Sequence, residues 1–494
     1  MPSVFPRADV SASVRDMRRI GGRSVQAAAL TVLILGQALA QISSELTDGP
    51  ASLQFRAWIA AINSGDLAQI TEFQTSNLPA AMRNPEAAAT LSFGTGGFDL
   101  RVIEETTLTR FVGLLEARES DDFWRLDFEV EPESPHTFVR ASLQRTARPD
   151  SFVIPRMTEA EAIAGLHAEA ERKVASDRFS GAVLVARNEE VLFERAYGPA
   201  DHDRGTPNTV DTRFRIGSMN KMFTAASVLQ LVQAGRVELM ASLATYVADY
   251  PNEELAAKVT IHHLLTHTGG TGDFFGPEYQ AVKDELRTLD DYMTLLGERG
   301  LEFEPGTEWK YSNYGYILLG IVIERVSGQS YYDYVDEHIY EPAGMTASGS
   351  EPENRDVADQ SVGYMRPPGS DDWQPNSDTL PFRGTSAGGG YSTVRDLFRF
   401  ARALLGHKLL DARHTDLMTT GVVETGWGRY GYGLPDFRGA DGAGWVGHNG
   451  AAPGMNGDLK IYPKSGYVTV VLSNLSPPSA IDLGNYLYAR LPIR

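Results

Sequence analysis

The spacing of hydrophobic residues changes from one segment of the chain to the next, and each change predicts an element. Residues 48–66 carry large apolar side chains at helical spacing, namely Phe55, Trp58, Ile59 and Ile62. Between about 97 and 146 apolar and polar residues alternate, as in Phe98-Leu100-Val102, which is typical of antiparallel strands with one solvated face. A helix followed by such strands predicts a small α+β domain over residues 44–147.

A break in this pattern separates the first domain from the rest of the chain. Pro149 and Pro155 interrupt it and predict a linker over residues 148–157. Thr158, followed three residues later by Glu161, then has the spacing of a capping box at the start of a helix. We therefore expect a second domain over residues 158–494.

Hairpin patterns occur at both ends of this second domain. One spans residues 180–193, and the other spans residues 459–472 with a turn at 463–466. Strands at the two ends of one domain predict a shared central sheet. The segment from 218 to about 430 has mostly helical periodicity, so we expect an α/β fold of the α+β kind, in which helices and a mostly helical subdomain flank an antiparallel sheet.

The N-terminal segment has the three parts of a secretory signal. Basic residues precede an apolar stretch over residues 27–35, and Ala38-Leu39-Ala40 then forms a signal-peptidase pattern. The basic residues are Arg15, Arg18, Arg19 and Arg23. We expect a signal peptide over residues 1–40, cleavage after Ala40, and a periplasmic or secreted protein. The alternative is an uncleaved anchor, although the apolar run is short for the ~20 residues of a span.

Composition excludes several classes of function. The chain has 494 residues, which favours two or three domains, and a formal charge of −19. Nucleic-acid binding is not expected, because phosphate recognition needs a clustered positive surface. The absence of cysteine excludes disulfides, thiolate metal sites and cysteine nucleophiles. Beyond the signal no segment reaches 18 uninterrupted apolar residues, so no stable membrane span is expected after cleavage.

A serine and a lysine three residues apart are the first candidates for chemistry. Ser218-Met219-Asn220-Lys221 opens a predicted helix that runs to about Ala234 and ends at Gly235. Residues at this spacing share a helical face, so the Lys221 amine can reach the Ser218 hydroxyl. A lysine can take the proton of a serine when burial or a nearby cation lowers its pKa. A solvent-facing lysine is the alternative interpretation of this short motif.

Two further motifs strengthen the candidate. Tyr311-Ser312-Asn313 precedes an apolar helix, and Gly447-His448-Asn449-Gly450 lies just ahead of the last hairpin. In this order the three motifs resemble those of the serine β-lactamase and penicillin-binding-protein family, which includes class C β-lactamases, esterases and D-aminopeptidases. Residues 214–218, 264–270 and 386–393 resemble the same family. The resemblance covers about 158–475 and implies a β-lactamase-like fold.

The resemblance also implies roles for individual residues. Ser218 would attack an acyl carbon, while Lys221 and Tyr311 would move protons to and from it. Asn313 would hydrogen-bond the substrate amide or Lys221. The backbone N–H groups of Ser218 and Ala451 would form an oxyanion hole, which stabilises the transition state by ~3 kcal/mol per donor. Small-molecule or peptide substrates are implied, without a cofactor or a metal.

The third motif departs from the family pattern at His448. Penicillin-recognising members usually carry a lysine there, whose charge meets the substrate carboxylate, whereas a histidine of ordinary pKa near 6.5 is largely neutral at pH 7. Together with Gly450 we expect His448 to bind substrates without a carboxylate. The expected function is an exported hydrolase of esters or amides, esterase-like or D-amino-acid-peptidase-like. The alternatives are a β-lactamase or D-alanyl-D-alanine carboxypeptidase, and a penicillin-binding sensor that does not turn over.

Two rival sites have weaker patterns. Gly384-Thr385-Ser386-Ala387-Gly388 fits the nucleophile elbow of α/β-hydrolases, but that elbow needs a strand before the serine and a helix directly after it. His263 and His267, at helical spacing beside His262, suggest a metal site, yet Leu264 stands where a zinc protease has its glutamate. We interpret these histidines as a partly buried packing pair.

The first domain loosely resembles the cone-shaped domains of the nuclear-transport-factor-like superfamily, on the stretch from Trp58 to Asp66 followed by strands. Its polar residues show no catalytic grouping. We expect a packing or substrate-gating module.

Overall fold

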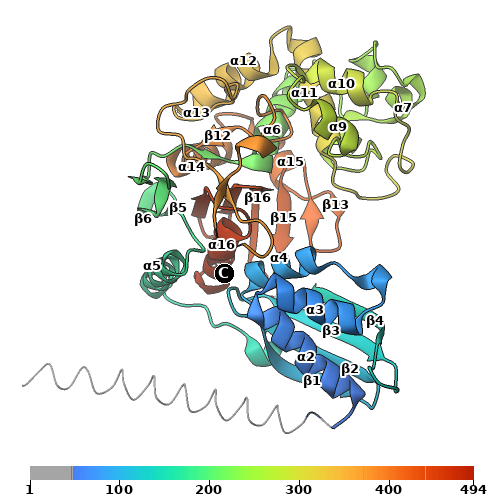
Figure 1. Ribbon diagram of the computed structural model, residues 1–494. Coiled ribbons are helices and arrows are strands. Elements are labelled where there is room, and N and C mark those ends of the chain that lie inside the picture. Colours follow the sequence, from blue (N-terminus) through green and yellow to red (C-terminus); the bar gives the residue numbers. More distant parts are fainter. Residues whose placement is uncertain (1–45, 47, 371, 440, 494) are drawn as a thin grey trace, which may run out of the picture. The chain divides into compact units, whose positions relative to one another are not determined.

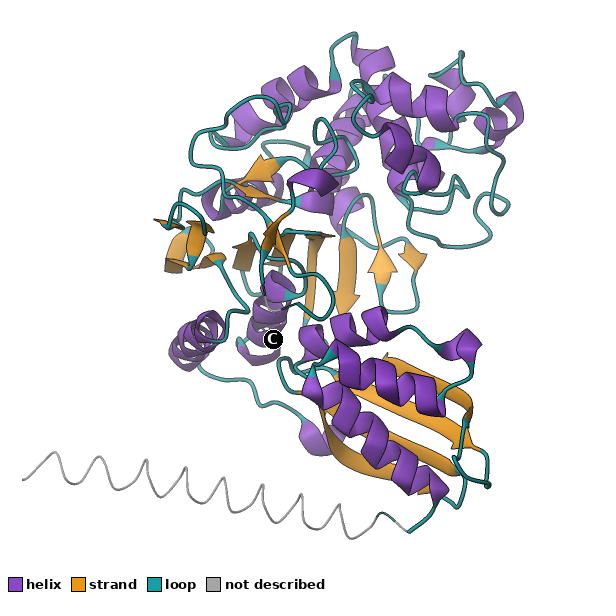
Figure 2. Ribbon diagram, viewed as in Figure 1, coloured by secondary structure: helices purple, strands orange, loops and turns teal. Residues whose placement is uncertain are grey.

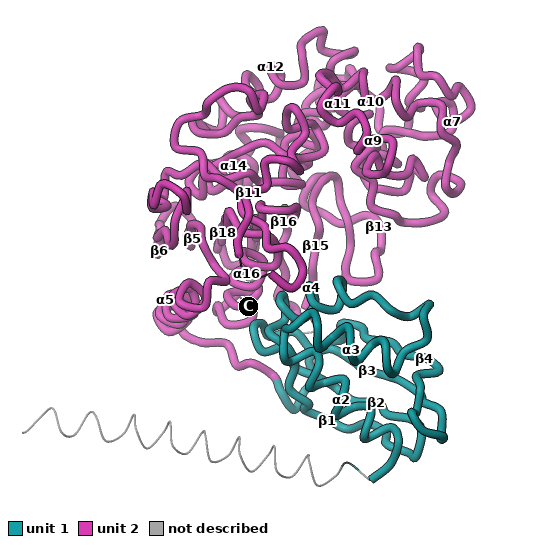
Figure 3. Tube along the Cα trace, viewed as in Figure 1, with its two compact units in different colours: residues 1–152 teal, residues 153–494 magenta. Residues whose placement is uncertain are grey.

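The chain folds into two compact units, Met1–Phe152 and Val153–Arg494, in a computed structural model (Figure 3). The structure describes residues 46, 48–370, 372–439 and 441–493. The expected signal peptide over residues 1–40 lies outside the described residues. Within the described ranges, no helix combines the length and the apolar character needed to cross a bilayer.

Over residues 48–152, unit 1 consists of three α-helices on one face of a four-stranded antiparallel sheet (Figure 2). The strands are adjacent in sequence order. The elements are α2 (Pro50–Ser64), α3 (Leu67–Asn77), α4 (Pro85–Thr95), β1 (Phe98–Thr106), β2 (Arg110–Ala117), β3 (Phe123–Val130) and β4 (Phe138–Thr146).

The two faces of this sheet differ as the alternating pattern predicts. Phe98, Phe111 and Phe128 are fully buried beneath the helices, where Phe55 of α2 stacks on Phe111 at 4.3 Å between ring centroids. The next residue along β3 from Leu126, Asp127, points to the opposite face and pairs there with arginines of β2 and β4. Aromatic packing on the helical face therefore forms the core of unit 1.

Unit 2 has an eight-stranded antiparallel sheet whose strand order is β13-β14-β15-β16-β17-β18-β5-β6. Both predicted hairpins are present as β5–β6 and β17–β18, and β5 pairs with β18 along its whole length. The strands are β5 (Gly181–Arg187), β6 (Glu190–Tyr197), β13 (Val423–Glu424), β14 (Arg429–Tyr430), β15 (Pro435–Arg438), β16 (Gly444–Ala452), β17 (Met455–Tyr462) and β18 (Tyr467–Ser473). The shared central sheet predicted from the sequence is confirmed.

Helices cover both faces of the unit 2 sheet (Figure 1). Val183 and Val185 of β5 pack on α5 (Glu159–Ala175) and α16 (Ser479–Arg490), while Leu184, between them, packs in the cluster that contains α6 (Asn220–Gln233), α11 (Asn313–Ser327) and α14 (Val394–Leu405). The capping box predicted at the start of α5 is formed by Thr158 and Glu161. The sheet is thus buried on both sides.

The segment between β6 and α14 forms the helical part of unit 2. Its shorter helices, with one that follows α14, are α7 (Glu253–Lys258), α8 (Ile261–Leu265), α9 (Pro277–Val282), α10 (Leu289–Leu296), α12 (Tyr331–Val335), α13 (Glu341–Ala343) and α15 (Ala412–Thr419). Short strands pair as β7 (Pro199–Asp201) with β8 (Thr206–Pro207), β9 (Phe214–Arg215) with β12 (Tyr391–Ser392), and β10 (Tyr364–Met365) with β11 (Gln374–Pro375).

Candidate active site

Ser218 lies in a 3₁₀ turn, Gly217–Met219, that leads directly into α6. The α-helix begins at Asn220, two residues later than Ser218, and ends before Gly235 in the left-handed conformation, as predicted. Ser218 is half-buried whereas Lys221 is fully buried. The Lys221 Nζ nevertheless lies 3.3 Å from the Ser218 Oγ.

Three oxygen atoms surround the Lys221 amine. Besides the Ser218 hydroxyl, the amine contacts the Asn313 Oδ1 at 2.7 Å and the Ala387 carbonyl oxygen at 2.6 Å. Burial lowers the pKa of Lys221 to about 7. A neutral amine has two N–H groups, and both carbonyl oxygens accept one each, so its lone pair is left to accept the proton of Ser218. This arrangement suits a general base.

Tyr311 lies on the other side of the serine. Its phenol hydrogen-bonds with Ser218, and its ring centroid is 4.8 Å from the Lys221 Nζ. Burial raises the pKa of Tyr311, so the phenol keeps its proton at neutral pH. The tyrosine directly precedes Ser312, whose side chain caps α11 by accepting from the Gly315 N–H. The capped start of α11 therefore holds the Tyr311 phenol, a proton donor, beside Ser218.

An aspartate that the sequence analysis did not identify as part of this site orients Asn313. The Asn313 Nδ2 donates to the Asp273 Oδ2 at 2.8 Å, which leaves the amide oxygen directed at Lys221. The negative charge of Asp273 raises the pKa of Lys221, against the larger effect of burial. Asp273 stands just beyond the family-like stretch 264–270, and only its position in space connects it with the site.

The third motif lies on β16, an inner strand of the sheet. A side chain on Gly450 would collide with the main chain, because its Cβ would lie 1.9 Å from the Ile216 carbonyl oxygen. The turn that carries Ser218 is therefore packed directly on this strand. A Cβ on Gly217 would lie 3.2 Å from the Ala451 nitrogen, so the backbone of Ala451 is adjacent to the serine turn.

The register of β16 sets the direction of the Ala451 N–H. A two-residue turn joins Ala452 to Met455, which makes these two a hydrogen-bonded pair. Positions alternate in an antiparallel ladder, so Ala451, opposite Asn456, directs its N–H away from β17. That direction faces the Ser218 turn, as an oxyanion hole built from the two backbone N–H groups requires.

His448 is buried on the same strand and is electrically neutral. Its Nδ1 donates to the Asn449 carbonyl oxygen at 2.5 Å, because a carbonyl can only accept, and its Nε2 therefore accepts from the Tyr430 hydroxyl at 3.3 Å. Burial, with a smaller effect of the nearby Lys221 charge, lowers the pKa of His448 to about 3. His448 is therefore uncharged over a wider pH range than a histidine of ordinary pKa.

His267 contacts the residues on both sides of Tyr311, a role that the sequence pattern did not predict. Its backbone carbonyl accepts from the Lys310 N–H at 3.0 Å, and its Nδ1 accepts from the Ser312 N–H at 3.1 Å. Tyr311 stands between Lys310 and Ser312 in the sequence, and its ring centroid is 4.3 Å from that of His267. Burial, reinforced by the charges of nearby groups, keeps the pKa of His267 well below its ordinary value. A neutral histidine thus fixes the tyrosine.

The three neighbouring histidines have separate partners. Helix α8 ends at Leu265, so His267 does not continue the helical face of His263. His262 hydrogen-bonds the Tyr432 hydroxyl, and His263 caps the helix through the Thr260 N–H. Among the residues that the structure describes, no group of three or more histidines and carboxylates is placed to hold a metal ion.

Ser386 lies in a loop and is fully buried. A Cβ on Gly320 of α11 would lie 2.4 Å from the Ser386 Oγ, so the hydroxyl is packed against that helix. The next α-helix, α14, begins only at Val394. The segment contributes to the site through the Ala387 carbonyl that accepts from Lys221.

Comparisons with known proteins agree with this geometry. The family model described as Beta-lactamase matches residues 166–491. Penicillin-binding protein 4 of Amycolatopsis lactamdurans is 31% identical over 313 residues, which cover 60% of this chain and 80% of that protein. Esterase EstB of Burkholderia gladioli is 36% identical over 208 residues, covering 38% of this chain and 53% of that protein.

A solved structure shares the fold. The crystal structure of a penicillin-binding protein from Bacillus halodurans superposes with a TM-score of 0.60 at 33% identity, covering 66% of this chain and 98% of that one. The family match lies entirely within Val153–Arg494.

Proposed function

Since the chain belongs to the β-lactamase family of serine hydrolases, we propose that unit 2 hydrolyses esters or amides through an acyl-enzyme on Ser218. One observation carries this proposal. Lys221 is fully buried, its amine contacts two carbonyl oxygens, and its third contact is with the Ser218 hydroxyl. Such an amine activates a serine at neutral pH, because its pKa matches the operating pH.

The first half-reaction transfers the acyl group to the enzyme. The Ser218 oxygen forms a bond to the acyl carbon while its proton passes to the Lys221 Nζ. The carbonyl oxygen becomes an oxyanion beside the N–H groups of Ser218 and Ala451. Tyr311, which retains its proton at neutral pH, donates it to the departing alcohol or amine and is reprotonated from Lys221. The tetrahedral intermediate then collapses to the acyl-enzyme.

The second half-reaction releases the acid. Water attacks the ester carbon of the acyl-enzyme and gives its proton to Tyr311 and Lys221, which act as one proton-accepting pair. The bond to the Ser218 oxygen breaks, and the serine recovers its proton. Both half-reactions use the same donors, so the site returns to its starting state without a cofactor.

The third motif favours substrates that carry no carboxylate. Both ring nitrogens of His448 are engaged by the protein, and its pKa near 3 leaves it uncharged at neutral pH. A carboxylate at this position would lose its hydration without gaining a cation. We therefore rank esters and neutral amides above β-lactams and D-alanyl-D-alanine peptides as substrates.

The ranking is tested with p-nitrophenyl esters, D-amino-acid amides and nitrocefin on the wild type, Ser218→Ala and Ser386→Ala. We expect short-chain esters to be turned over faster than nitrocefin, and Ser218→Ala to lose about a thousandfold or more of kcat. Ser386→Ala, with the same chemical change, should remain active. Activity lost in Ser386→Ala but kept in Ser218→Ala would contradict the nucleophile, and a product burst that stops at one equivalent would indicate a sensor.

We also infer that residues 1–40 direct export and are removed. The order of basic, apolar and small residues supports this, with Ala40 at the cleavage position. N-terminal sequencing of the protein from intact cells should begin at Gln41. An N-terminus at Met1 in a membrane fraction would instead support a retained anchor.

A further inference from the structure

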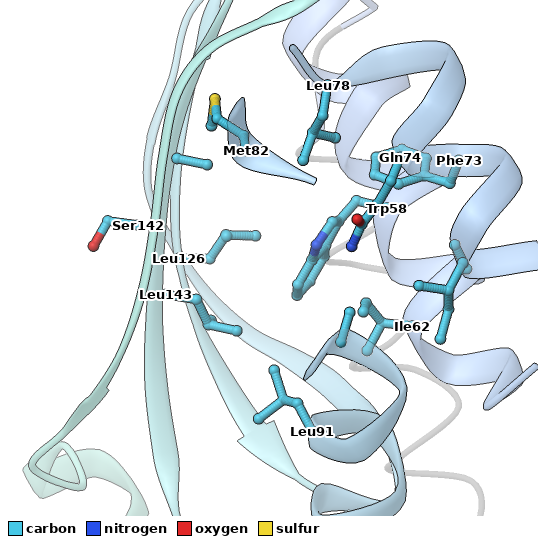
Figure 4. Close-up of a pocket in the computed structure, with 14 residues that line it drawn as sticks. Trp58, Ile62, Phe73, Gln74, Leu78, Met82, Leu91, Leu126, Ser142 and Leu143 are labelled. Carbon is cyan, nitrogen blue, oxygen red and sulfur yellow. The ribbon is translucent and has the colours of Figure 1, made fainter. Parts of the chain in front are cut away.

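Unit 1 contains a half-open cavity of about 370 Å³ between its helices and the β3–β4 side of its sheet (Figure 4). Helices α2, α3 and α4 form one wall, with Trp58 and Phe73 among their contributions, and Leu126 and Leu143 form the wall on the sheet. A volume of this size is typical of small-molecule sites in proteins. The cavity lies wholly within unit 1 and shares no residue with the Ser218 site.

The lining offers apolar contact and no charge. Twelve of the fourteen lining residues are apolar, and the polar ones are Gln74 and Ser142. Gln74 is already paired, since its Oε1 accepts from the Asn84 N–H at 2.7 Å. Ser142 directs its hydroxyl away from the cavity, as its alternation with Ala141 and Leu143 on β4 requires (Figure 4).

Small side chains keep the space open. Ala61, Ala88 and Ala141 stand on three different elements around it, where longer apolar side chains would fill it. By contrast, Phe98 and Phe111 fill the β1–β2 side of the same sheet and are fully buried. A cavity with so few polar groups holds water poorly, so an apolar occupant gains contacts without displacing well-bound water.

We propose that unit 1 binds one uncharged, predominantly hydrocarbon small molecule in this cavity. An ionised group on the ligand must lie at the opening, because no side chain of opposite charge lines the interior. The proposal is independent of the function proposed for unit 2.

The uncharged fluorophore N-phenyl-naphthylamine tests the site in the full chain. We expect a saturable rise in fluorescence with one equivalent bound. Displacement should require less n-decanol than decanoate at pH 8, because only the carboxylate is charged. Displacement that favours decanoate would contradict the ligand class.

A matched pair of variants on β4 locates the binding. Ala141→Leu adds bulk to the face that lines the cavity, and Ser142→Leu adds comparable bulk to the opposite face of the same strand. We expect Ala141→Leu to weaken binding about tenfold or more, and Ser142→Leu to change it less than about twofold. Equal affinities in the two variants would contradict the site.

A second variant guards against misfolding of the first. Ala88→Leu fills the cavity from α4, and near-ultraviolet circular dichroism and melting temperature show whether each variant is folded. A folded Ala88→Leu protein that binds the fluorophore as tightly as the wild type would overturn the proposal. Hydrolysis by Ser218 is measured in parallel and should be unchanged, so failure here leaves the function of unit 2 untouched.

Discussion

In the proposed mechanism, the protonation state of Lys221 controls the nucleophile Ser218. In this mechanism the neutral amine accepts the serine proton. Because the pKa of Lys221 is about 7, a large fraction of the amine is neutral at physiological pH. We expect log kcat/KM for an ester to rise with pH below about 7 and to level off above it. The pKa of His448 near 3 and the raised pKa of Tyr311 predict no falling limb between pH 7 and 9.

A pH series on a neutral ester measures this profile. Lys221→Arg is the control, since the guanidinium stays protonated and cannot accept a proton at any pH in the series. That variant should lose activity throughout the range. A bell-shaped profile that falls below pH 9 would show that the reaction requires a protonated group whose pKa is below that expected for Tyr311.

Asp273 has two separable effects on the same amine. Asp273→Asn keeps an oxygen that can accept from the Asn313 amide but removes the charge that raises the pKa of Lys221. We therefore expect the rising limb of the pH profile to move to lower pH with little loss of plateau activity. Asp273→Ala also frees the Asn313 side chain and should lower kcat about tenfold to a hundredfold. A profile midpoint unchanged in both variants would contradict the electrostatic role.

At the scale of elements, the contact between the Ser218 turn and β16 sets the position of the proposed nucleophile relative to the proposed oxyanion hole. Gly450→Ala must displace the main chain at Ile216. We expect kcat/KM to fall about a hundredfold and the free energy of unfolding to fall by about 1–3 kcal/mol. Gly300→Ala is the matched control, because a Cβ there meets nothing within 4 Å. Wild-type kcat/KM in Gly450→Ala would contradict this coupling.

The sequence predicted well those elements that depend on residues close together in the chain. The capping box at Thr158, the two hairpins and the end of α6 at Gly235 depend on neighbouring residues, and each is present. Strands β13 and β14 were not predicted, because two residues are too few to show an alternating pattern. Their place in the sheet depends on pairing with β15.

For the site, motif spacing identified residues at or just before the starts of α6 and α11 and residues on β16, and the structure places them close together. The sequence did not identify Asp273, His267 and Tyr430 as part of the site, because each contacts a motif residue from a distant segment of the chain. His267 looked like a neighbour of His263, but α8 ends at Leu265 and a left-handed backbone at His267 turns the chain toward Tyr311. No periodicity contains that information.

At the scale of the whole molecule, the chain has two units with separate cores. Phe111→Ala removes a fully buried ring from unit 1 and should destabilise that unit by about 3–5 kcal/mol. Hydrogen exchange followed by peptide mass analysis should report faster exchange within residues 48–152. Peptides from β5 and β18 should keep their protection, and loss of protection there would show that the two cores unfold as one.

The pairing of β5 with β18 also has a consequence for how the enzyme is made. A chain synthesised from its N-terminus delivers Gly181–Arg187 long before Tyr467–Ser473, so the edge of β5 is without its partner strand until then. Such a waiting edge is a site of misassembly, and long-range pairing is slow. We therefore expect maturation of the hydrolase to wait for β18, because a nascent chain that stalls before residue 467 contains the serine motif but lacks the strand that pairs with β5.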